Sequence, residues 1–146
     1  MTIRHARSTS LVTLVSLFAC LLALEFVQAA TPGQNAVTYL QSQFGLNDAQ
    51  ARGALGALLV YAREQLPKPD FDLLATRIPN ADQIMQAVKL QGVVTRPLDT
   101  ISDYEESLAS LGIGQPLASQ IAPAVIQYLG AAGFDHERDI LMGILR

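Results

Sequence analysis

The sequence contains few residues that could carry covalent or metal chemistry. Its 146 residues include one cysteine, two histidines and no tryptophan. Cys20 and His5 lie in an N-terminal segment that we expect to be removed, which leaves His136 as the only histidine of the mature chain. Such a chain cannot form a disulfide, a cysteine-based zinc or iron–sulfur site, or a two-histidine metal site within one protomer. We therefore expect no metal, no cofactor and no thiol catalysis.

Charged residues make up only 16% of the sequence, with 10 basic and 13 acidic side chains and a net charge of −3. Without Arg4, Arg7 and Glu25, the mature chain keeps 8 basic and 12 acidic residues, a net charge of −4. Proteins that bind nucleic acid draw much of their affinity from clustered basic side chains. We therefore expect no nucleic-acid partner. Half of the residues are hydrophobic, which argues for one packed domain and against disorder.

Residues 1–29 have the layout of a secretory signal peptide. Two arginines lie within the first seven residues, an apolar run covers residues 11–24, and the segment ends in Val27-x-Ala29. The apolar run is shorter than the roughly 20 residues that cross a membrane. We predict a signal peptide helix that is cleaved after Ala29, which leaves residues 30–146 as a periplasmic or secreted domain.

A second interpretation of this segment is a lipoprotein signal. Residues 17–20 read Leu-Phe-Ala-Cys, so cleavage before Cys20 would leave a cysteine that can carry a lipid. The apolar run continues past Cys20, whereas a lipoprotein usually continues with a polar tether, and this favours the soluble form. We expect membrane contact only through the signal segment or through a lipid on Cys20.

The rest of the sequence predicts an all-α fold, a compact bundle of about six or seven short helices. Apolar residues recur at helical spacing between turn and capping residues, and no run of alternating β-branched and aromatic residues indicates a strand. The expected helices cover residues 35–44, 48–66, 71–78, 81–90, 102–111, 116–131 and 135–145. Their expected capping residues are Asn47 with Gln50, Asp70, Asn80 with Gln83, Ser102 with Glu105, and Asp135.

The helix expected at 48–66 carries a row of small residues, Ala49, Gly53 and Ala57. Glycines at 53 and 56 each cost a helix about 1 kcal/mol relative to alanine. Close packing of another helix would compensate for that cost. Grooves along such a row could also hold a ligand or a partner.

The two halves of the chain resemble each other at an offset of 67 residues. Residues 44–46 match residues 111–113, and the matches continue for Ala51 with Ala118, Ala57 with Ala124, and Tyr61 with Tyr128. After a shift of four residues, Phe71-Asp72 matches Phe134-Asp135. We interpret residues 34–90 and 101–146 as half-repeats that form two lobes around one core.

Several of these segments resemble the VcgC/VcgE-like family of exported bacterial proteins of unknown function. The resemblance rests on Phe44-Gly45-Leu46, the run QARGALGALL at residues 50–59, the turn at Pro79, Leu111-Gly112-Ile113 and Ile121-Ala122-Pro123. It covers most of residues 34–145 through small-residue helix patterns. It implies a small helical protein and supplies no established catalytic residue.

Three groups of polar residues are candidates for chemistry. Asp135, His136, Glu137 and Asp139 form the densest cluster, and Asp70 with Asp72 could be the carboxylate pair of a glycosidase. The third group is Asp103, Glu105 and Glu106. Acidic residues also favour the first turn of a helix for electrostatic reasons, and we interpret all three groups as helix starts. Ser102 and Ser119 lack the sequence context of a nucleophilic serine.

Residues 107–134 contain no charged side chain. This segment could contact a partner or a membrane, but its glutamines, prolines and glycines favour a buried central helix. The composition as a whole predicts an exported, non-enzymatic binding, scaffolding or envelope-associated protein that contacts a protein partner or a second copy of itself. The alternatives are an extracytoplasmic hydrolase that uses Asp70, Asp72 or Asp135, and a lipoprotein tethered through Cys20.

Overall fold

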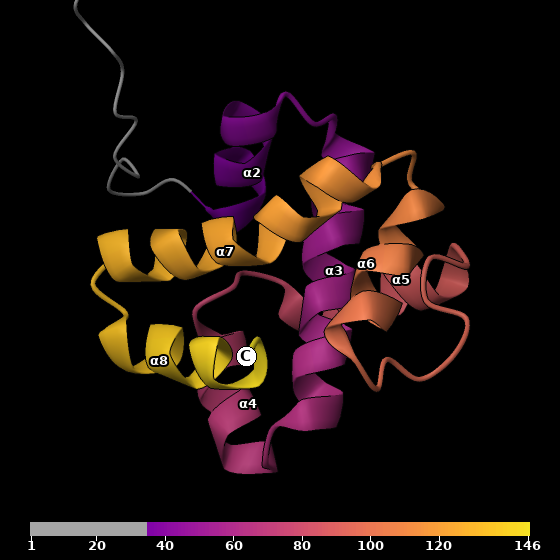
Figure 1. The fold of residues 1–146 in the computed structure, drawn as a ribbon. Coiled ribbons are helices and arrows are strands. Elements are labelled where there is room, and N and C mark those ends of the chain that lie inside the picture. Colours follow the sequence, from indigo (N-terminus) through magenta and orange to yellow (C-terminus); the bar gives the residue numbers. More distant parts are fainter. Residues whose placement is uncertain (1–34) are drawn as a thin grey trace, which may run out of the picture.

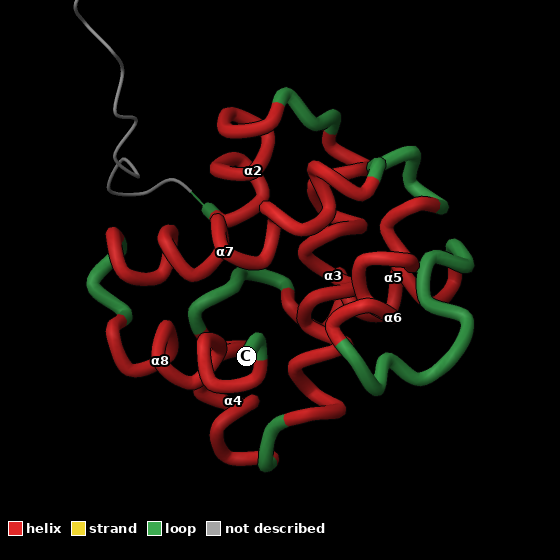
Figure 2. The backbone as a smooth tube through the Cα atoms, in the orientation of Figure 1, coloured by secondary structure: helices red, strands yellow, loops and turns green. Residues whose placement is uncertain are grey.

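The structure is a computed structural model, and it describes residues 35–146 (Figure 1). The expected signal peptide at 1–29, its cleavage site and Cys20 lie outside the described residues. Within them helices joined by loops are the only regular secondary structure, which confirms the all-α prediction (Figure 2). The helices are α2 (Ala36–Phe44), α3 (Asp48–Gln65), α4 (Lys68–Thr76), α5 (Ala81–Leu90), α6 (Ile101–Ala109), α7 (Gln115–Ala131) and α8 (Asp135–Ile144).

Helix α3 is the central element of the bundle. Its residues 53–62 are buried without interruption, and α2, α4, α5, α6 and α8 pack around it. A helix that is apolar on every side requires cover on every side. The uncharged segment 107–134 was expected to form a buried central helix: seven residues of α7 are buried, but the central position belongs to α3. Helix α7 in that segment packs on α2, α6 and α8 and keeps one side exposed.

The glycines of α3 permit close helix contacts. A Cβ atom at Gly56 would lie 2.6 Å from Cγ1 of Val88 and 2.9 Å from the carbonyl oxygen of Ile84, both on α5. A Cβ atom at Gly53 would lie 2.6 Å from the side chain of Leu111. These distances confirm that the glycines allow neighbouring elements to approach α3.

Most of the expected helix starts were right to within a few residues, but several caps were wrong. The Asn47–Gln50 capping box is present, with Asn47 Oδ1 accepting from the Gln50 amide at 2.9 Å. Helix α6 is capped by Thr100 with Asp103 rather than by Ser102 with Glu105. Two capping patterns overlap in this sequence, and the one that begins two residues further upstream satisfies the first amides of the helix that forms.

The other three expected caps also do not cap. Helix α4 begins at Lys68, before Asp70, because Pro69 fits the first turn of a helix. Asn80 precedes α5 in a left-handed conformation with φ of 60°, so its side chain makes no capping bond. Asp135 is the first residue of α8, not its cap, and it pairs with Arg138.

Two helix starts in the first half of the chain recur at the same spacing in the second half. Helices α3 and α4 begin at residues 48 and 68, and α7 and α8 begin at 115 and 135, which is 67 residues later in both cases. Gly45 and Gly112, with φ of 65° and 74°, precede α3 and α7 at the same spacing. The starts of α4 and α8 keep the offset of 67 without the shift of four residues by which Phe71-Asp72 matches Phe134-Asp135. At a constant offset, Leu74 corresponds to Leu141, and each is 1% exposed.

Candidate functional site

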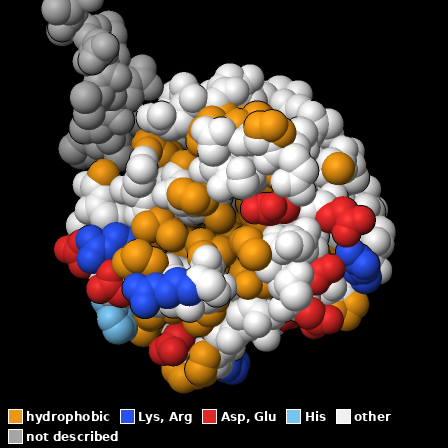
Figure 3. All heavy atoms as spheres, viewed as in Figure 1, with side chains coloured by type: hydrophobic (Ala, Val, Ile, Leu, Met, Phe, Trp, Pro, Cys, Tyr) orange, Lys and Arg blue, Asp and Glu red, His pale blue; other side chains and the backbone are white. Residues whose placement is uncertain are grey.

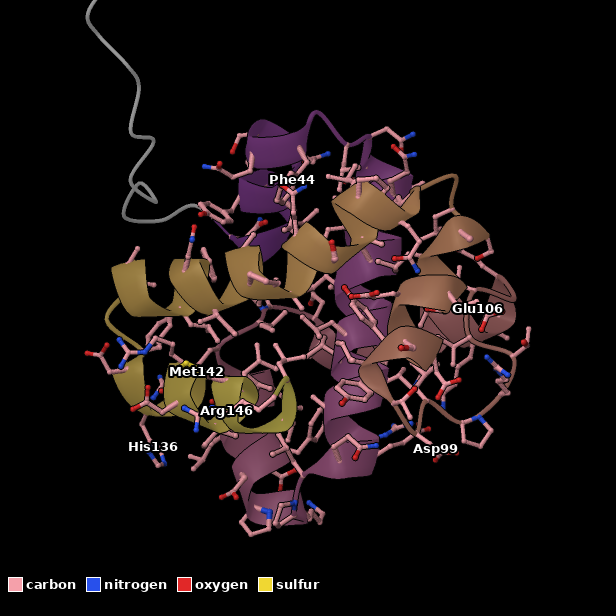
Figure 4. All side chains as sticks on the ribbon, in the orientation of Figure 1. Phe44, Asp99, Glu106, His136, Met142 and Arg146 are labelled. Atoms are coloured by element: carbon pink, nitrogen blue, oxygen red, sulfur yellow. The ribbon has the colours of Figure 1, made fainter. Side chains whose placement is uncertain are left out.

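The carboxylates that the sequence offered for catalysis do not converge. Asp72 is exposed and pairs with Lys68 of its own helix, with 2.6 Å between Nζ and Oδ2. Asp70 lies in the first turn of the same helix. His136 lies at the edge of the molecule and points away from it, on the opposite side from Glu106 (Figure 4). Within residues 35–146 no three histidine or acidic side chains are grouped as a metal site would require.

The cluster at residues 135–139 divides between the surface and the interior. Asp135 and Asp139 both pair with Arg138 at the surface. Glu137 turns inward to 4% exposure and accepts a hydrogen bond from Nε of Arg77 at 2.7 Å. This hydrogen bond lowers the pKa of the Glu137 carboxyl. The Arg77 guanidinium also lies 4.8 Å from the centroid of the Phe134 ring.

These contacts give Glu137 a structural role. They connect the C-terminal end of α4 to the start of α8 and leave the carboxylate with a charged partner in a buried position. Sequence reasoning missed the pair because Arg77 and Glu137 are 60 residues apart in the chain. The two side chains meet only because α4 packs on α8.

The third acidic group forms a surface network around Arg96. Nη2 of Arg96 lies 2.9 Å from Asp103 and 2.6 Å from Glu106. Asp103 also accepts from Thr100 in the capping box, and these hydrogen bonds lower the pKa of its carboxyl. A cavity of about 190 Å³ is lined by Arg96, Asp103, Glu106 and the loop before α6. Arg96, Asp103 and Glu106, the charged groups at this cavity, are already paired with one another.

Tyr104 carries a buried hydroxyl without a partner. Its side chain is fully buried on α6, and its ring centroid lies 6.3 Å from that of Tyr61. Burial raises the pKa of the Tyr104 phenol far above its usual range, so the group stays protonated. The Tyr61 hydroxyl, in contrast, donates to the carbonyl oxygen of Ile144 at 2.9 Å. Tyr104 does not line the cavity beside Arg96.

The strongest candidate site is a cavity of about 330 Å³ between α3 and α5. Ala49 and Gly53, two members of the small-residue row, contribute to its wall together with Ile84, Ala87 and Val88 of α5. The sequence suggested that rows of small residues leave a groove between the two lobes, and the structure has a groove on this row. The cavity lies within the first half of the chain rather than between the two halves.

Polar groups surround the apolar part of this cavity. Asp48 and Arg52 form an ion pair with 2.7 Å between Oδ2 and Nε, and Asn80, Gln83 and Gln91 add amide groups. An apolar wall with a few polar groups at its edge is the usual composition of a ligand site.

A smaller hollow of about 110 Å³ adjoins this cavity. It shares Asp48, Arg52, Asn80 and Ile84 with the larger one and continues toward α2. The Asp48–Arg52 pair and the left-handed Asn80 therefore stand between the two spaces. We refer to the larger space as the α3–α5 cavity.

Among residues 35–146, no helix combines the length and the apolar character that a membrane span needs.

Comparison with curated proteins and comparison with solved structures give no match. The family model for the protein of unknown function VcgC/VcgE (DUF2780) matches residues 22–146. This match covers far more than half of the sequence and agrees with the motifs at residues 44–46, 50–59 and 111–113. The chain therefore belongs to the VcgC/VcgE family of proteins of unknown function.

Proposed function

We propose that this chain is an exported, non-enzymatic binding module whose ligand or partner segment occupies the α3–α5 cavity. The observation that carries the proposal is the composition of that cavity. Its wall is built from small and aliphatic side chains, and its polar groups are an existing ion pair and three amides. Amides can orient a ligand by hydrogen bonding, but they are poor general acids or bases.

The candidate catalytic groups give the hydrolase alternative no comparable support. Asp72 and Asp135 are exposed and pair with basic side chains of their own helices. None of the three cavities is lined by Asp70, Asp72, Asp135 or His136. A hydrolase that uses two carboxylates needs them on opposite sides of one bound bond.

Export and the internal repeat are parts of the same proposal. The layout of residues 1–29 supports a cleaved signal, and the intact mass of the cellular protein tests it. A chain that begins at Ala30 supports export in soluble form, whereas a lipid adduct on a chain that begins at Cys20 supports the tethered form. The constant offset of 67 residues between the starts of α3 and α7 and of α4 and α8 supports a duplication.

Site-specific photocrosslinking in cells tests the binding role. Gln83 and Gln86 are both exposed on α5, but only Gln83 lines the cavity. A photoreactive residue at position 83 should give discrete adducts in the cell envelope, and the same residue at position 86 should not. Ala87→Leu, which adds volume to the cavity wall, should abolish the adducts while circular dichroism shows an intact fold.

Two results would contradict this proposal. Equal adduct formation at positions 83 and 86 would mean that the partner does not bind preferentially at the cavity. Adducts at position 83 that persist in the Ala87→Leu variant would place the partner outside the cavity.

A further inference from the structure

Charged residues are absent from two segments that the fold brings together. Residues 35–47 and 107–134 contain no Asp, Glu, Lys or Arg. All 20 charged residues of the described part lie elsewhere (23 in the whole sequence, less Arg4, Arg7 and Glu25). The two segments include α2 and α7, which pack on each other, with 5.5 Å between the ring centroids of Tyr39 and Tyr128. Exposed residues of the two helices therefore contribute an uncharged region to the surface.

This surface occupies the upper part of the view in Figure 3, where no Lys, Arg, Asp or Glu side chain is visible. We call it the neutral face and define it by the exposed Gln43, Gln120, Pro123 and Gln127 and the half-buried Phe44. Phe44 lies where α2 meets α7 (Figure 4). The charged side chains visible in Figure 3 lie in its middle and lower parts.

Folding does not require the neutral face to lack charge. The exposed positions of α7 contact solvent, and a lysine or glutamate there would cost the fold little. The exposed sides of α5 and α8 do carry charges, among them Asp82, Lys89 and Asp139. Depletion of charged residues at the surface is, in contrast, a feature of the centres of protein interfaces.

We propose that the neutral face is a self-association surface that pairs with the same face of a second copy of this chain. The described part has 8 basic and 12 acidic residues, so two copies repel each other through their charged faces. The neutral face is where they can approach without bringing like charges together.

The side chains on this face are also complementary to themselves. A glutamine amide contains both donors and an acceptor, so Gln120 or Gln127 can bond to its own equivalent across a two-fold axis. A lysine or a glutamate cannot do this, since each would meet its own charge. Half-buried apolar groups such as Phe44, Leu117 and Ile126 would supply the contact area.

Sedimentation equilibrium on the protein purified from cells that express the full-length chain tests this proposal. We expect a monomer–dimer equilibrium that does not weaken as the salt concentration rises, because no ion pair forms at the contact. Gln127→Arg places two like charges across the two-fold axis and should raise the dissociation constant by about tenfold or more. Gln86→Arg, a change at another exposed glutamine, on α5, should leave the dissociation constant unchanged.

Three results would overturn the proposal. The first is a monomer at every concentration studied. The second is an association that Gln86→Arg weakens as much as Gln127→Arg does. The third is a monomer that binds phosphatidylcholine vesicles and loses that binding in Gln127→Arg, which would assign the face to a lipid surface. Each of these results leaves the α3–α5 cavity untested, because none of its lining residues belongs to the neutral face.

Discussion

Glycine residues set the distance between α3 and its neighbours, and this can be measured one position at a time. We expect Gly56→Ala to lower the free energy of unfolding by about 1–3 kcal/mol, because the new methyl group would overlap a carbonyl oxygen of α5 that cannot rotate away. Gly143→Ala in α8 is the control, since nothing lies within 4 Å of a Cβ atom there. That variant should gain up to about 1 kcal/mol from helix propensity. Urea denaturation measures the free energy of unfolding of both variants. Equal stabilisation by the two substitutions would contradict the close packing of α5 on Gly56.

Two tyrosines that lie beside each other should respond to the same change with opposite signs. Tyr61→Phe removes the hydrogen bond to the Ile144 carbonyl and should lower the free energy of unfolding by about 1 kcal/mol. Tyr104→Phe removes a buried hydroxyl that has no partner, and should raise it by about 1 kcal/mol. Thermal unfolding by circular dichroism distinguishes the signs. A loss of stability in Tyr104→Phe would mean that its hydroxyl is satisfied.

The Arg77–Glu137 pair should make stability depend on pH in the acid range. The pKa of Glu137 is lowered in the folded chain, so its contribution is present above its ordinary pKa of 4.5 and is lost as pH falls through the lowered value. Glu137→Gln should therefore be less stable than the wild type at neutral pH. The difference should shrink below about pH 4.5. Denaturation midpoints across pH 3–7 measure it, and a difference that is constant with pH would refute the pair's contribution.

Helix starts show how one element can be specified by overlapping signals. Thr100→Ala should lower the free energy of unfolding by about 1 kcal/mol, because the first amides of α6 lose the Thr100 hydroxyl. Ser102→Ala lies inside the first turn and makes no capping bond, so it should change stability by less than about 0.5 kcal/mol. Chemical denaturation compares the two variants. A larger loss of stability in Ser102→Ala than in Thr100→Ala would show that Ser102 is the cap, as the sequence suggested.

At this scale the sequence was informative about where helices lie and less so about how they begin. The bounds of α5, residues 81–90, were predicted to the residue, although the expected Asn80 cap is absent. Propensity and periodicity act within a helix, whereas a cap depends on the backbone angles of a single residue. Those angles are set by packing, which is why Asn80 in a left-handed conformation escaped prediction.

Packing partners were predictable only where small residues mark them. The row at Ala49 and Gly53 indicated a groove, and the α3–α5 cavity lies on it. The inward turn of Glu137 toward Arg77 left no local signal, because both residues also suit an exposed helix position. The identity of the central helix was missed for a similar reason. Both α3 and α7 have long apolar stretches. The structure shows that α3 is the central one, because five helices pack on α3 and three pack on α7.

The molecule as a whole should fold as one unit in spite of the resemblance between its two halves. Helix α3 of the first half is covered by α6 and α8 of the second, and α2 packs on α7. We therefore expect residues 34–90 and residues 101–146, each expressed alone, to lack a cooperative thermal transition, since each would expose its apolar face. Circular dichroism melts of the two pieces and of the whole chain test this. A cooperative transition in either piece would show that one lobe is stable alone.

The absence of charge from the neutral face also limits how large an assembly can grow. A pair joined through uncharged surfaces uses up that surface on both members, and the outside of the resulting particle carries all of the charge. A third molecule would meet an anionic shell in place of a free contact. The geometry therefore favours a closed, soluble particle over an open fibre.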